Sequence, residues 1–339
     1  MTIWYLRPTN GSDVAAGTSF ANAFKTFQKC ADSWVAGDTL RMCPEAVETT
    51  AVIIDLDTTS GTAAAPITIE TGNTTDGSRD MNLTYTIQAS ASIARIFNFP
   101  ATTANSYLKF FNLVLDGNGN ATKCVESLVD GASYLRWFNC RFTGATSDGV
   151  GLRSSTGQHK YFKCEFDNNG GVGASVGVAA RGDYMLYHCK IHDNTGDGVL
   201  SNAGGGDGIM ITRCEIYGNG ANGILVGSSG GGCQIIGNTI YNNAGDGIEL
   251  YNATSRHNYV IYHNSIVDNG GYGVFFQAGD PDIVAFMDYN HTHNNASGAS
   301  DLTLPGDNNV VGDPKFTNVG TGFEDFTPLP GSPLIAVGM

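Results

Sequence analysis

Residues 214–226 read CEIYGNGANGILV and belong to a unit that recurs about every 25 residues between residues 134 and 296. Each unit has an anchor, a cysteine or asparagine followed by a polar residue and then usually an apolar one. The anchors, spaced 24 to 26 residues apart, are Cys140, Cys164, Cys189, Cys214, Asn238, Asn264 and Asn290. A second mark, often Asp-Gly, follows in step at Asp148, Asp197, Asn222, Asp246 and Tyr272. Two marks that hold phase in this way indicate a repeat architecture.

The repeats are predicted to be strands and not helices. Apolar residues alternate over short runs such as 209–211 and 224–226, with Gly or Asn between the runs. Each unit therefore predicts three short strands, which in one unit span 259–263, 265–268 and 272–277. Strands of successive units would stack in parallel, about 4.8 Å apart, to give a solenoid of about ten coils.

The anchor column is predicted to point inward, because small residues that stack on themselves suit a buried turn. A metal or redox site is the functional alternative for regularly spaced cysteines. Metal sites use short Cys-x-x-Cys pairs, however, and none occurs. We therefore expect free buried thiols. Ion pairs between coils are expected from the residues that follow four anchors and alternate in sign, Arg141, Glu165, Lys190 and Glu215.

The composition excludes some classes of partner. The chain has 339 residues and a net charge of −14, which argues against binding to nucleic acid. No run approaches 18 apolar residues, so no membrane span is expected. The first residues, MTIWYLRPTNGSD, contain no signal segment. We expect an extracellular or phage-associated protein, either made without a signal or with its signal removed.

The two ends depart from the repeat. Between Ser19 and Trp34 apolar residues recur at helical spacing, with Ser19 as N-cap, so a helix is expected to cover the open end of the solenoid. Prolines after residue 304 predict an extended tail that lies along the solenoid or closes its far end. The chain is thus predicted to be one domain, with a cap at 1–60, coils at 61–296 and a tail at 297–339.

The terminal segments carry a resemblance to a known group. WYLRPTNGSD from residue 4, FKTFQKCADSWVAGDTLRM from residue 24 and APITI from residue 65 resemble the entry segment of the pectate-lyase-like superfamily. GDPKFTNVGTGFEDFTPLPGSPLIAVG, residues 312–338, is similar to the closing segment. The resemblance implies an all-β, single-stranded right-handed parallel β-helix. That superfamily contains polysaccharide lyases, glycoside hydrolases, uronate epimerases, phage depolymerases and non-catalytic proteins.

The resemblance places polysaccharide clefts on the strand after the Asp-Gly mark and on its flanking turns. Alternation gives the inward residues of two successive strands as Val150, Leu152, Val178 and Ala180. One outward column is then predicted to contain Arg153, Arg181, Asn202, Gly227, Tyr251 and Gln277. Two arginines on adjacent rungs repel each other unless an anion lies between them, and a uronate carboxylate would suit. The alternative is a surface network in which Asp148, Asp183 or Glu126 neutralises the pair.

The preferred function is that of a polysaccharide lyase that acts on a uronate-containing polysaccharide by β-elimination. The resemblance implies Arg153 or Arg181, with Asp183, as the catalytic group or carboxylate clamp. The residues predicted to bind substrate are Asn202, Glu249, Tyr251 and Gln277. Ca²⁺ is the candidate cofactor, and its predicted ligands are Asp148, Asp197 and Asp207, with Asp183 and Glu249 also available. Residues 279–282 are a second candidate cation site. A simple turn role is the preferred interpretation of Asp246 and stays open for Asp197.

Two other function classes stay open. A glycoside hydrolase would need two carboxylates about 5–10 Å apart, drawn from Asp148, Asp183 and Asp197. The NTD, DD, GHG and RIK motifs of polygalacturonases and the DPH motif of uronan epimerases are absent. A non-catalytic phage or surface β-helix would bind glycans as a monomer or homotrimer. A further outward aromatic column, which we expect the tail to cover, contains Phe138, Phe162 and Tyr187.

Overall fold

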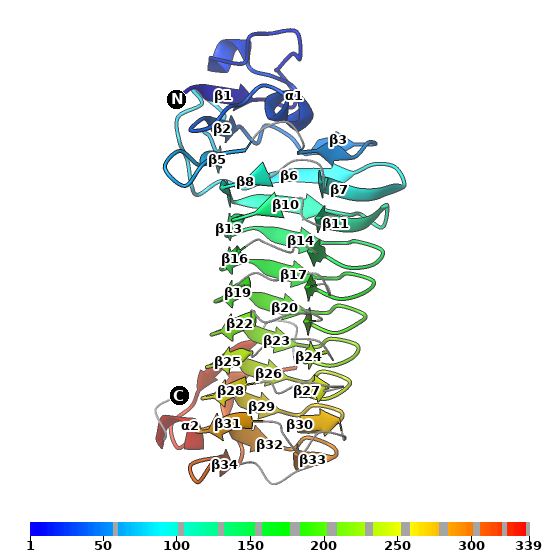
Figure 1. Cartoon of the computed structure of the whole chain (residues 1–339), viewed down its shortest axis with the longest axis vertical. Helices are drawn as coiled ribbons and strands as arrows, with labels where there is room; N and C mark the ends of the chain where they lie inside the picture. The colour runs from blue at the N-terminus through cyan, green and yellow to red at the C-terminus, as the bar shows by residue number, and fades with distance from the viewer. Residues whose placement is uncertain are drawn as a thin grey trace.

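The computed structural model describes residues 1–56, 60–100, 105–127, 132–152, 158–176, 184–201, 209–227, 233–251, 258–277, 284–300, 306–320 and 324–336. Its strands stack into a long solenoid with three parallel sheets, here called A, B and C (Figure 1). Each regular coil contributes one strand to each sheet, in the order A, B, C. The predicted all-β parallel solenoid is therefore confirmed.

Sheet A has 11 strands. They are β1 (Ile3–Leu6), β2 (Thr39–Met42), β5 (Ile67–Thr71), β9 (Leu108–Phe111), β13 (Arg136–Phe138), β16 (His159–Phe162), β19 (Tyr184–Tyr187), β22 (Ile209–Thr212), β25 (Gln234–Ile236), β28 (Asn258–Tyr262) and β31 (Val284–Asp288). Inward residues such as Phe110, Trp137 and Ile211 are fully buried. The rings of Phe110 and Trp137 stack with centroids 3.9 Å apart, so this sheet supplies much of the aromatic core.

Sheet B also has 11 strands. They are β3 (Glu48–Thr50), β6 (Tyr85–Ala89), β10 (Leu113–Asp116), β14 (Arg141–Thr143), β17 (Glu165–Asp167), β20 (Lys190–His192), β23 (Glu215–Tyr217), β26 (Thr239–Tyr241), β29 (Ser265–Val267), β32 (His291–His293) and β34 (Val310–Val311). From β13 to β32, two residues join each sheet A strand to the next sheet B strand. The first of the two has a positive φ, for example 53° at Asn139 and 55° at His263, which turns the chain sharply.

Sheet C has 10 strands. They are β4 (Ile54–Asp55), β7 (Ile93–Phe99), β11 (Ala121–Ser127), β15 (Val150–Leu152), β18 (Ala174–Val176), β21 (Val199–Ser201), β24 (Ile224–Val226), β27 (Ile248–Tyr251), β30 (Tyr272–Gln277) and β33 (Gly298–Ser300). A separate two-stranded sheet pairs β8 (Asn105–Ser106) with β12 (Ala132–Ser133).

The solenoid has about eight turns, slightly fewer than the ten or so that we predicted. The regular turns begin with β9 and end with β33. The strand sets β2–β3–β4 and β5–β6–β7 also pair across the three sheets, but longer connections separate their strands. Because these connections are longer than those of the regular coils, fewer residues remain for regular coils than the repeat length predicted.

The anchor column lies inside the solenoid, as predicted. All eight cysteines are buried and free. The Cys164 thiol lies 3.5 Å from the carbonyl oxygen of Trp137 in the preceding coil, and burial raises the pKa of this thiol. In the asparagine part of the column, the Asn238 amide donates to Asn264 Oδ1 and to the Ile211 carbonyl, both at 2.9 Å. Thiol and amide therefore fill the same position and point a hydrogen at the same kind of acceptor.

A second stack of buried asparagines, five residues after the anchors, was not predicted. Its members are Asn169, Asn194, Asn219, Asn243, Asn269 and Asn295. Each side-chain amide donates to the side-chain oxygen of the next member at 2.8–3.0 Å. Close packing on the next coil explains the glycine of the second mark, because a Cβ on Gly198 would lie 2.7 Å from the Gly223 carbonyl oxygen and 2.9 Å from the Asn219 amide nitrogen of the ladder.

The alternating charges on sheet B form the predicted ion pairs. Arg141 lies 3.6 Å from Glu165, and Lys190 lies 3.1 Å from Glu215. Arg141 also binds the buried carboxylate of Asp167, with Nε and Oδ1 2.7 Å apart. Burial alone would raise the pKa of Asp167, but the Arg141 guanidinium lowers it below its ordinary value.

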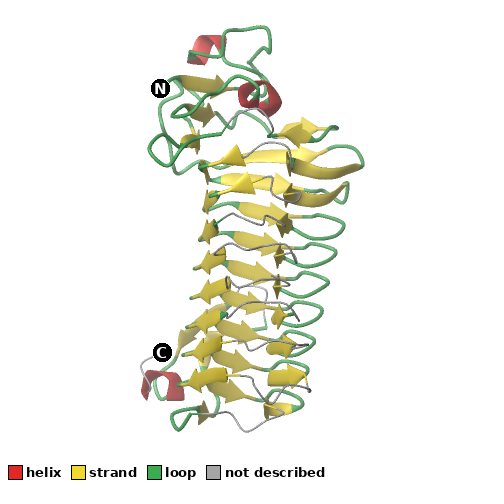
Figure 2. Ribbon diagram, in the orientation of Figure 1, coloured by secondary structure: helices red, strands yellow, loops and turns green. Residues whose placement is uncertain are grey.

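The N-terminal helix differs from the prediction. Two short helices replace the expected continuous one, η1 (Phe20–Asn22) and α1 (Phe27–Ala31). Ser19 caps η1, but Phe24 then leaves the helical path to bridge Leu6 of β1. Helix α1 places Phe27 against Phe97 of β7, with ring centroids 4.9 Å apart, at the start of the solenoid core. The short helices lie near the two ends of the molecule (Figure 2), and none that is described is long and apolar enough to cross a membrane.

The C-terminal tail runs back along the last coils (Figure 1). It contains an antiparallel hairpin of β35 (Phe316–Asn318) and β36 (Asp325–Pro328), followed by α2 (Pro333–Ala336). Phe326 packs against Tyr217 and Tyr241 of sheet B, with ring centroids 5.5 and 5.6 Å away. No ring contact among the described residues joins the tail to the sheet A column of Phe138, Phe162 and Tyr187, which we expected the tail to cover.

Candidate functional site

The outer face of sheet C is where the resemblance places polysaccharide clefts. In register from the N-terminal end, its outward column consists of Asp55, Asn98, Glu126, Gly151, Ser175, Leu200, Leu225, Glu249 and Phe275. Polar and charged side chains therefore lie toward both ends of this column. The two polar regions are separated by small and apolar residues, Gly151, Ser175, Leu200 and Leu225.

Four charged side chains form a cluster at the N-terminal end of this face, here called the charged cluster. Arg95 and Lys123 occupy neighbouring rungs on β7 and β11. Arg95 Nη1 lies 2.8 Å from Glu126 Oε2, and Lys123 Nζ lies 3.0 Å from Glu126 Oε1. Lys123 Nζ is also 3.5 Å from Asp148 Oδ2. The four side chains are 12–20% exposed, so their charges are screened less than those of surface ion pairs.

The surroundings of the charged cluster hold its cations in place. A Cβ at Gly151 would lie only 2.9 Å from Lys123 Nζ, so the absence of a side chain there makes room for the ammonium group. Arg95 Nη1 donates to Asn98 Oδ1 at 3.0 Å, and Asn98 in turn donates to Asp55 Oδ1 at 2.6 Å. Arg95 Nε is buried and has no hydrogen-bond partner among the described residues. The guanidinium thus keeps one donor uncommitted.

The Asp-Gly marks are turns that link neighbouring coils. Asp197 Oδ1 accepts the N–H of Asn222 at 2.9 Å, and Asn222 Oδ1 accepts the N–H of Asp246 at 2.7 Å. Asp148 Oδ1 accepts the N–H of Val172 at 3.2 Å in the same way. The turn role that we left open for Asp197 therefore accounts for one of its carboxylate oxygens.

An acidic pair, Asp197 and Glu249, lies in the C-terminal half of the face. Asn222 joins the two, because its side-chain amide donates to Glu249 Oε2 at 2.8 Å while its N–H binds Asp197. Burial raises the pKa of Asp197. Burial, together with the charges of Asp246 and Asp197, raises the pKa of Glu249. Carboxyls with raised pKa values are suited to proton transfer, although structural networks also produce them.

Only part of the predicted site lies within the described residues. Outside them are Arg153, Arg181, Asp183, Asn202, Asp207 and the loop 279–282. Asp148 and Asp197 lie in turns that precede β15 and β21, two rungs apart, which corresponds to about 10 Å along the solenoid. Glu249 lies on β27, and the backbone of Tyr251 pairs with Gln277 of β30. The structure therefore brings Glu249 close to Asn222 and Asp197 but keeps Asp148 apart from them.

The strand register shows that the third strand of the second coil begins earlier than predicted. Strand β15 pairs with β18 so that Leu152 lies beside Val176. The described third strand of the second coil is Ala174–Val176, which begins earlier than predicted, and the segment around Val178 and Ala180 lies outside the described residues. Arg153 follows β15 directly, whereas Arg181 comes five positions after the end of β18. Arg153 and Arg181 both lie outside the described residues, so their place in one column stays a prediction.

The described carboxylates do not fit a calcium site. No group of three or more His, Cys, Asp or Glu in the described part of the chain is placed to hold a metal ion. Calcium takes about six to eight oxygen ligands. One oxygen of Asp148 accepts a backbone N–H and the other faces the Lys123 ammonium, so neither is free for a cation. The predicted ligands Asp183 and Asp207 lie outside the described residues.

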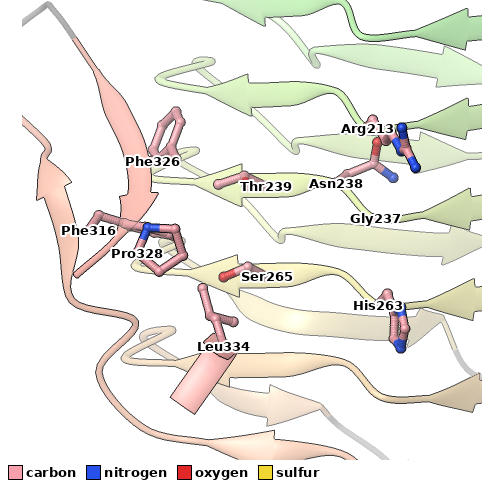
Figure 3. Close-up of a pocket in the computed structure, with 10 residues that line it drawn as sticks. All are labelled: Arg213, Gly237, Asn238, Thr239, His263, Ser265, Phe316, Phe326, Pro328 and Leu334. Atoms are coloured by element: carbon pink, nitrogen blue, oxygen red, sulfur yellow. The ribbon is translucent and has the colours of Figure 1, made fainter. Parts of the chain in front are cut away.

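A groove separates the tail from the coils at the turn between sheets A and B (Figure 3). Its volume is about 310 Å³, and a wider hollow of about 520 Å³ adjoins it near His188 and Lys190. The coils contribute Arg213, Thr239, His263 and Ser265, and the tail contributes Phe316, Phe326, Pro328 and Leu334. None of the predicted site residues lines it. We therefore assign the groove to docking of the tail.

The sequence interpretation missed Arg95 and Lys123. Both precede residue 134, where the sequence repeat begins, so no second mark fixes their phase. In β11 the strict alternation also breaks, because Cys124 and Val125 are both buried. As a result Lys123 and Glu126, three positions apart, share the outer face. Only the charges themselves could have signalled this cluster.

Comparison with models of protein families gives one match. Residues 125–316, more than half of the chain, match the model described as the right-handed beta helix region. The chain belongs to the right-handed β-helix family. The handedness that the resemblance implied is therefore confirmed. No curated protein sequence matches this chain significantly.

Several solved structures are similar to this β-helix. A pectate lyase, Pel9A, is 14% identical with a TM-score of 0.69, over 98% of this chain and 90% of its own. ORF18 of Geobacillus virus E2 is 13% identical with a TM-score of 0.62, over 84% of this chain and 56% of its own. A rhamnogalacturonan lyase is 14% identical with a TM-score of 0.53, over 95% and 92%. At these identities the likeness shows the fold.

Proposed function

We propose that this chain is a carbohydrate-active β-helix that cleaves an acidic, uronate-containing polysaccharide by β-elimination at the outer face of sheet C. The observation that carries the proposal is the charged cluster, in which Arg95 and Lys123 lie on neighbouring rungs of that face. Two β-helices of similar fold, a pectate lyase and a rhamnogalacturonan lyase, are named for this class of activity. The similar virus protein is compatible with an extracellular or phage-associated setting.

The proposed chemistry requires a cation beside the sugar carboxylate. A base removes the proton from the carbon next to the carboxylate, the electron pair forms a carbon–carbon double bond, and the glycosidic oxygen leaves and takes up a proton. Negative charge grows on the carboxylate during this step, so a fixed cation stabilises the transition state. Arg95 and Lys123 are the described cations at this face.

The remaining roles fall on residues near the ends of the sheet C strands. Arg153, directly after β15, is proposed as the base or as a second carboxylate clamp, with Arg181 and Asp183 in the same role further along the chain. Further sugar units would contact Asn202, Glu249, Tyr251 and Gln277. The substrate would then extend along the column from the charged cluster toward Glu249.

Calcium dependence is a separate part of the proposal. The described carboxylates Asp148 and Asp197 are occupied by turn contacts, so a calcium ion would need Asp183 and Asp207 as ligands. If these residues bind Ca²⁺, the ion would supply further positive charge for the substrate carboxylate. No step of the elimination above depends on it.

A glycoside hydrolase is the second candidate, because Asp197 and Glu249 both have raised pKa values and share Asn222. One carboxyl would protonate the leaving oxygen while the other carboxylate activates water or attacks the sugar. A non-catalytic β-helix that binds glycans as a monomer or homotrimer would need neither reaction.

The test is a panel of pectate, alginate, chondroitin, hyaluronan and neutral glucans, incubated with Ca²⁺ or with EDTA. Ultraviolet absorbance reports the unsaturated uronate of elimination, and reducing ends report any cleavage. The variants are Arg153→Ala, Arg181→Ala and Lys123→Met. Arg79→Ala is the matched control, because Arg79 is 54% exposed and pairs with Glu70 far from sheet C.

The outcomes separate the candidates. Absorbance that rises on one uronate polymer and falls at least about tenfold in Lys123→Met, but not in Arg79→Ala, is the expected result. Loss of that absorbance with EDTA would support the calcium part. Reducing ends without absorbance would favour hydrolysis and the Asp197–Glu249 pair. Unchanged absorbance in all three variants would refute the proposed roles.

A further inference from the structure

Sheet A carries a row of cations on its outer face that the proposed reaction does not use. Arg136 of β13 pairs in register with Lys109 of β9 on one side and with Lys160 of β16 on the other. Neighbouring rungs are about 4.8 Å apart, so three positive charges lie within about 10 Å along the solenoid. The chain as a whole has only 18 Lys and Arg and a net charge of −14, which makes three cations in a row unusual.

These cations lack the acidic partners that other cations on the solenoid have. Among the described residues, no Asp or Glu forms an ion pair with Lys109, Arg136 or Lys160. The Arg136 guanidinium instead donates to two backbone carbonyls, those of Leu135 and Gln158, at 3.3 and 2.7 Å. Burial lowers the pKa of Arg136, and the nearby phenols of Tyr134 and Tyr107 only partly oppose this.

Aromatic stacks flank the cations on both sides. Two residues after each cation, the rings of Phe111, Phe138 and Phe162 stack with centroids 4.6 and 4.9 Å apart. Two residues before them, Tyr107 and Tyr134 stack with centroids 4.5 Å apart and nearly parallel planes. We call these residues, with Lys109, Arg136 and Lys160, the cationic strip. The rings cover one another's faces, so their partly exposed edges border the cations, and apolar edges beside fixed cations suit a ligand made of rings that bear anionic groups.

Nothing described in the chain covers the cationic strip. The tail packs on Tyr217 and Tyr241 of sheet B, and its hairpin lies over later coils. The three cations and the Phe stack are partly exposed. Like charges on adjacent rungs destabilise a sheet unless an anion lies between them. The described residues of these coils offer no such anion, so an external one would relieve the repulsion.

We propose that the cationic strip binds an anionic polysaccharide chain along the solenoid axis, as a second, non-catalytic site on a different sheet from the charged cluster. Successive acidic groups of the chain would meet Lys109, Arg136 and Lys160, and sugar rings would pack on the flanking aromatic side chains. The strip would hold the polymer on the protein while another segment reaches sheet C. This inference goes beyond the proposed function, because binding here does not depend on cleavage there.

Charge favours a polysaccharide over a second copy of the chain. A twofold contact through this face would place the same three cations of each copy against each other. A second copy also carries the same net charge of −14, so long-range repulsion opposes association. A polyanion, in contrast, is attracted by the three cations of the strip.

The test measures binding by affinity electrophoresis in gels that contain polygalacturonate, alginate, chondroitin sulfate or dextran. The variant Lys109→Gln/Arg136→Gln/Lys160→Gln removes the charges. Its matched control, Lys25→Gln/Lys190→Gln/Lys315→Gln, removes three exposed cations away from sheet A and changes the net charge equally. Lys109→Arg/Arg136→Lys/Lys160→Arg keeps every charge and tests whether folding alone explains a loss. Cleavage of short oligosaccharides and sedimentation are measured on the same proteins.

The expected result is retardation by at least one acidic polymer but not by dextran, with dissociation constants about tenfold or more higher in the Gln triple variant. The control and the charge-keeping variant should bind like the parent protein. Equal binding by the Gln triple variant, or no binding of the parent to any acidic polymer, would overturn the inference. So would a parent oligomer that the Gln triple variant loses, since the face would then join copies. If Lys123→Met loses oligosaccharide cleavage but still binds the polymer, the result supports a role of sheet C in cleavage and a separate binding site on sheet A.

Discussion

Replacing Asn243 by Ala tests whether the buried asparagine ladder holds the coils together. Asn243 is 1% exposed. Its Oδ1 accepts the Asn219 N–H at 3.2 Å and the Asn219 side-chain amide at 2.8 Å. Its own amide donates to the Ile216 carbonyl at 3.1 Å and to Asn269 Oδ1 at 3.0 Å. The substitution therefore removes four buried hydrogen bonds from three successive coils.

The magnitude follows from these four bonds. At about 1 kcal/mol of net stabilisation each, their loss costs about 4 kcal/mol in the free energy of unfolding. The Asn219 N–H is left without an acceptor, which adds to the cost, whereas water that enters the space left by the side chain would reduce it. Asn242→Gly is the matched control, because Asn242 is the exposed neighbour and has a φ of 51°, which glycine adopts without strain.

The assay is urea unfolding followed by circular dichroism, with hydrogen exchange at the Asn219 amide as a local readout. Asn243→Ala should lower the free energy of unfolding by about 4 kcal/mol and speed exchange at Asn219. Asn242→Gly should change the stability by about 0.5 kcal/mol or less. A loss below about 1 kcal/mol in Asn243→Ala, with exchange at Asn219 unchanged, would refute the argument that the ladder is a main source of stability.

Three further predictions concern the core, the thiols and the tail. Burial raises the pKa of Glu48 to about 7 from an ordinary 4.5, against hydrogen bonds from the Phe27 N–H and the Tyr85 hydroxyl. The folded state thus holds this proton more tightly than the unfolded chain, so stability should fall by about 3 kcal/mol as pH rises from about 4.5 to about 7. Glu48→Gln should flatten that fall in urea titrations across this pH range, and an unchanged slope would contradict the assignment. The eight cysteines are buried, and burial raises the pKa of Cys124 to about 12, so a thiol reagent should label none of them in native buffer and all eight in denaturant. Rapid labelling of the native protein would show that the thiol column is open to solvent. Phe326→Ala removes the ring contacts of the tail with sheet B and should speed proteolysis of the tail while the coils melt as before; unchanged proteolysis would show that other contacts hold the tail.

The repeat made the fold predictable because two marks in phase fix both the strand order and the inward column. The buried cysteine ladder and the alternating ion pairs on sheet B followed from the same columns. The asparagines five residues after the anchors hold the same phase in the sequence. The Asn residues between the apolar runs were interpreted only as breaks between strands, because a turn and a buried ladder select the same residue type.

The predicted site depended on features that the repeat does not fix. The coil after Cys164 carries Val172-Gly173 where other coils carry Asp-Gly, so alternation alone placed its third strand too late. Alternation has a period of two residues and cannot detect an even-numbered shift along the chain. The charged cluster was missed because β11 buries two consecutive residues. Pairing between distant strands, which brings Arg95 beside Lys123, is not encoded in any local pattern.

The two-residue connection between sheets A and B restricts how a solenoid of this kind can change length during evolution. From β13 to β32 it never varies, and its positive-φ residue and inward anchor leave no space for an insertion. Spacing between anchors nevertheless ranges from 24 to 26 residues. The connections from sheet C back to sheet A differ by a residue, from six residues after β15 to seven after β18. Gene duplication could therefore add whole coils without disturbing either ladder, whereas single insertions would accumulate beside sheet C and diversify the border of its outer face.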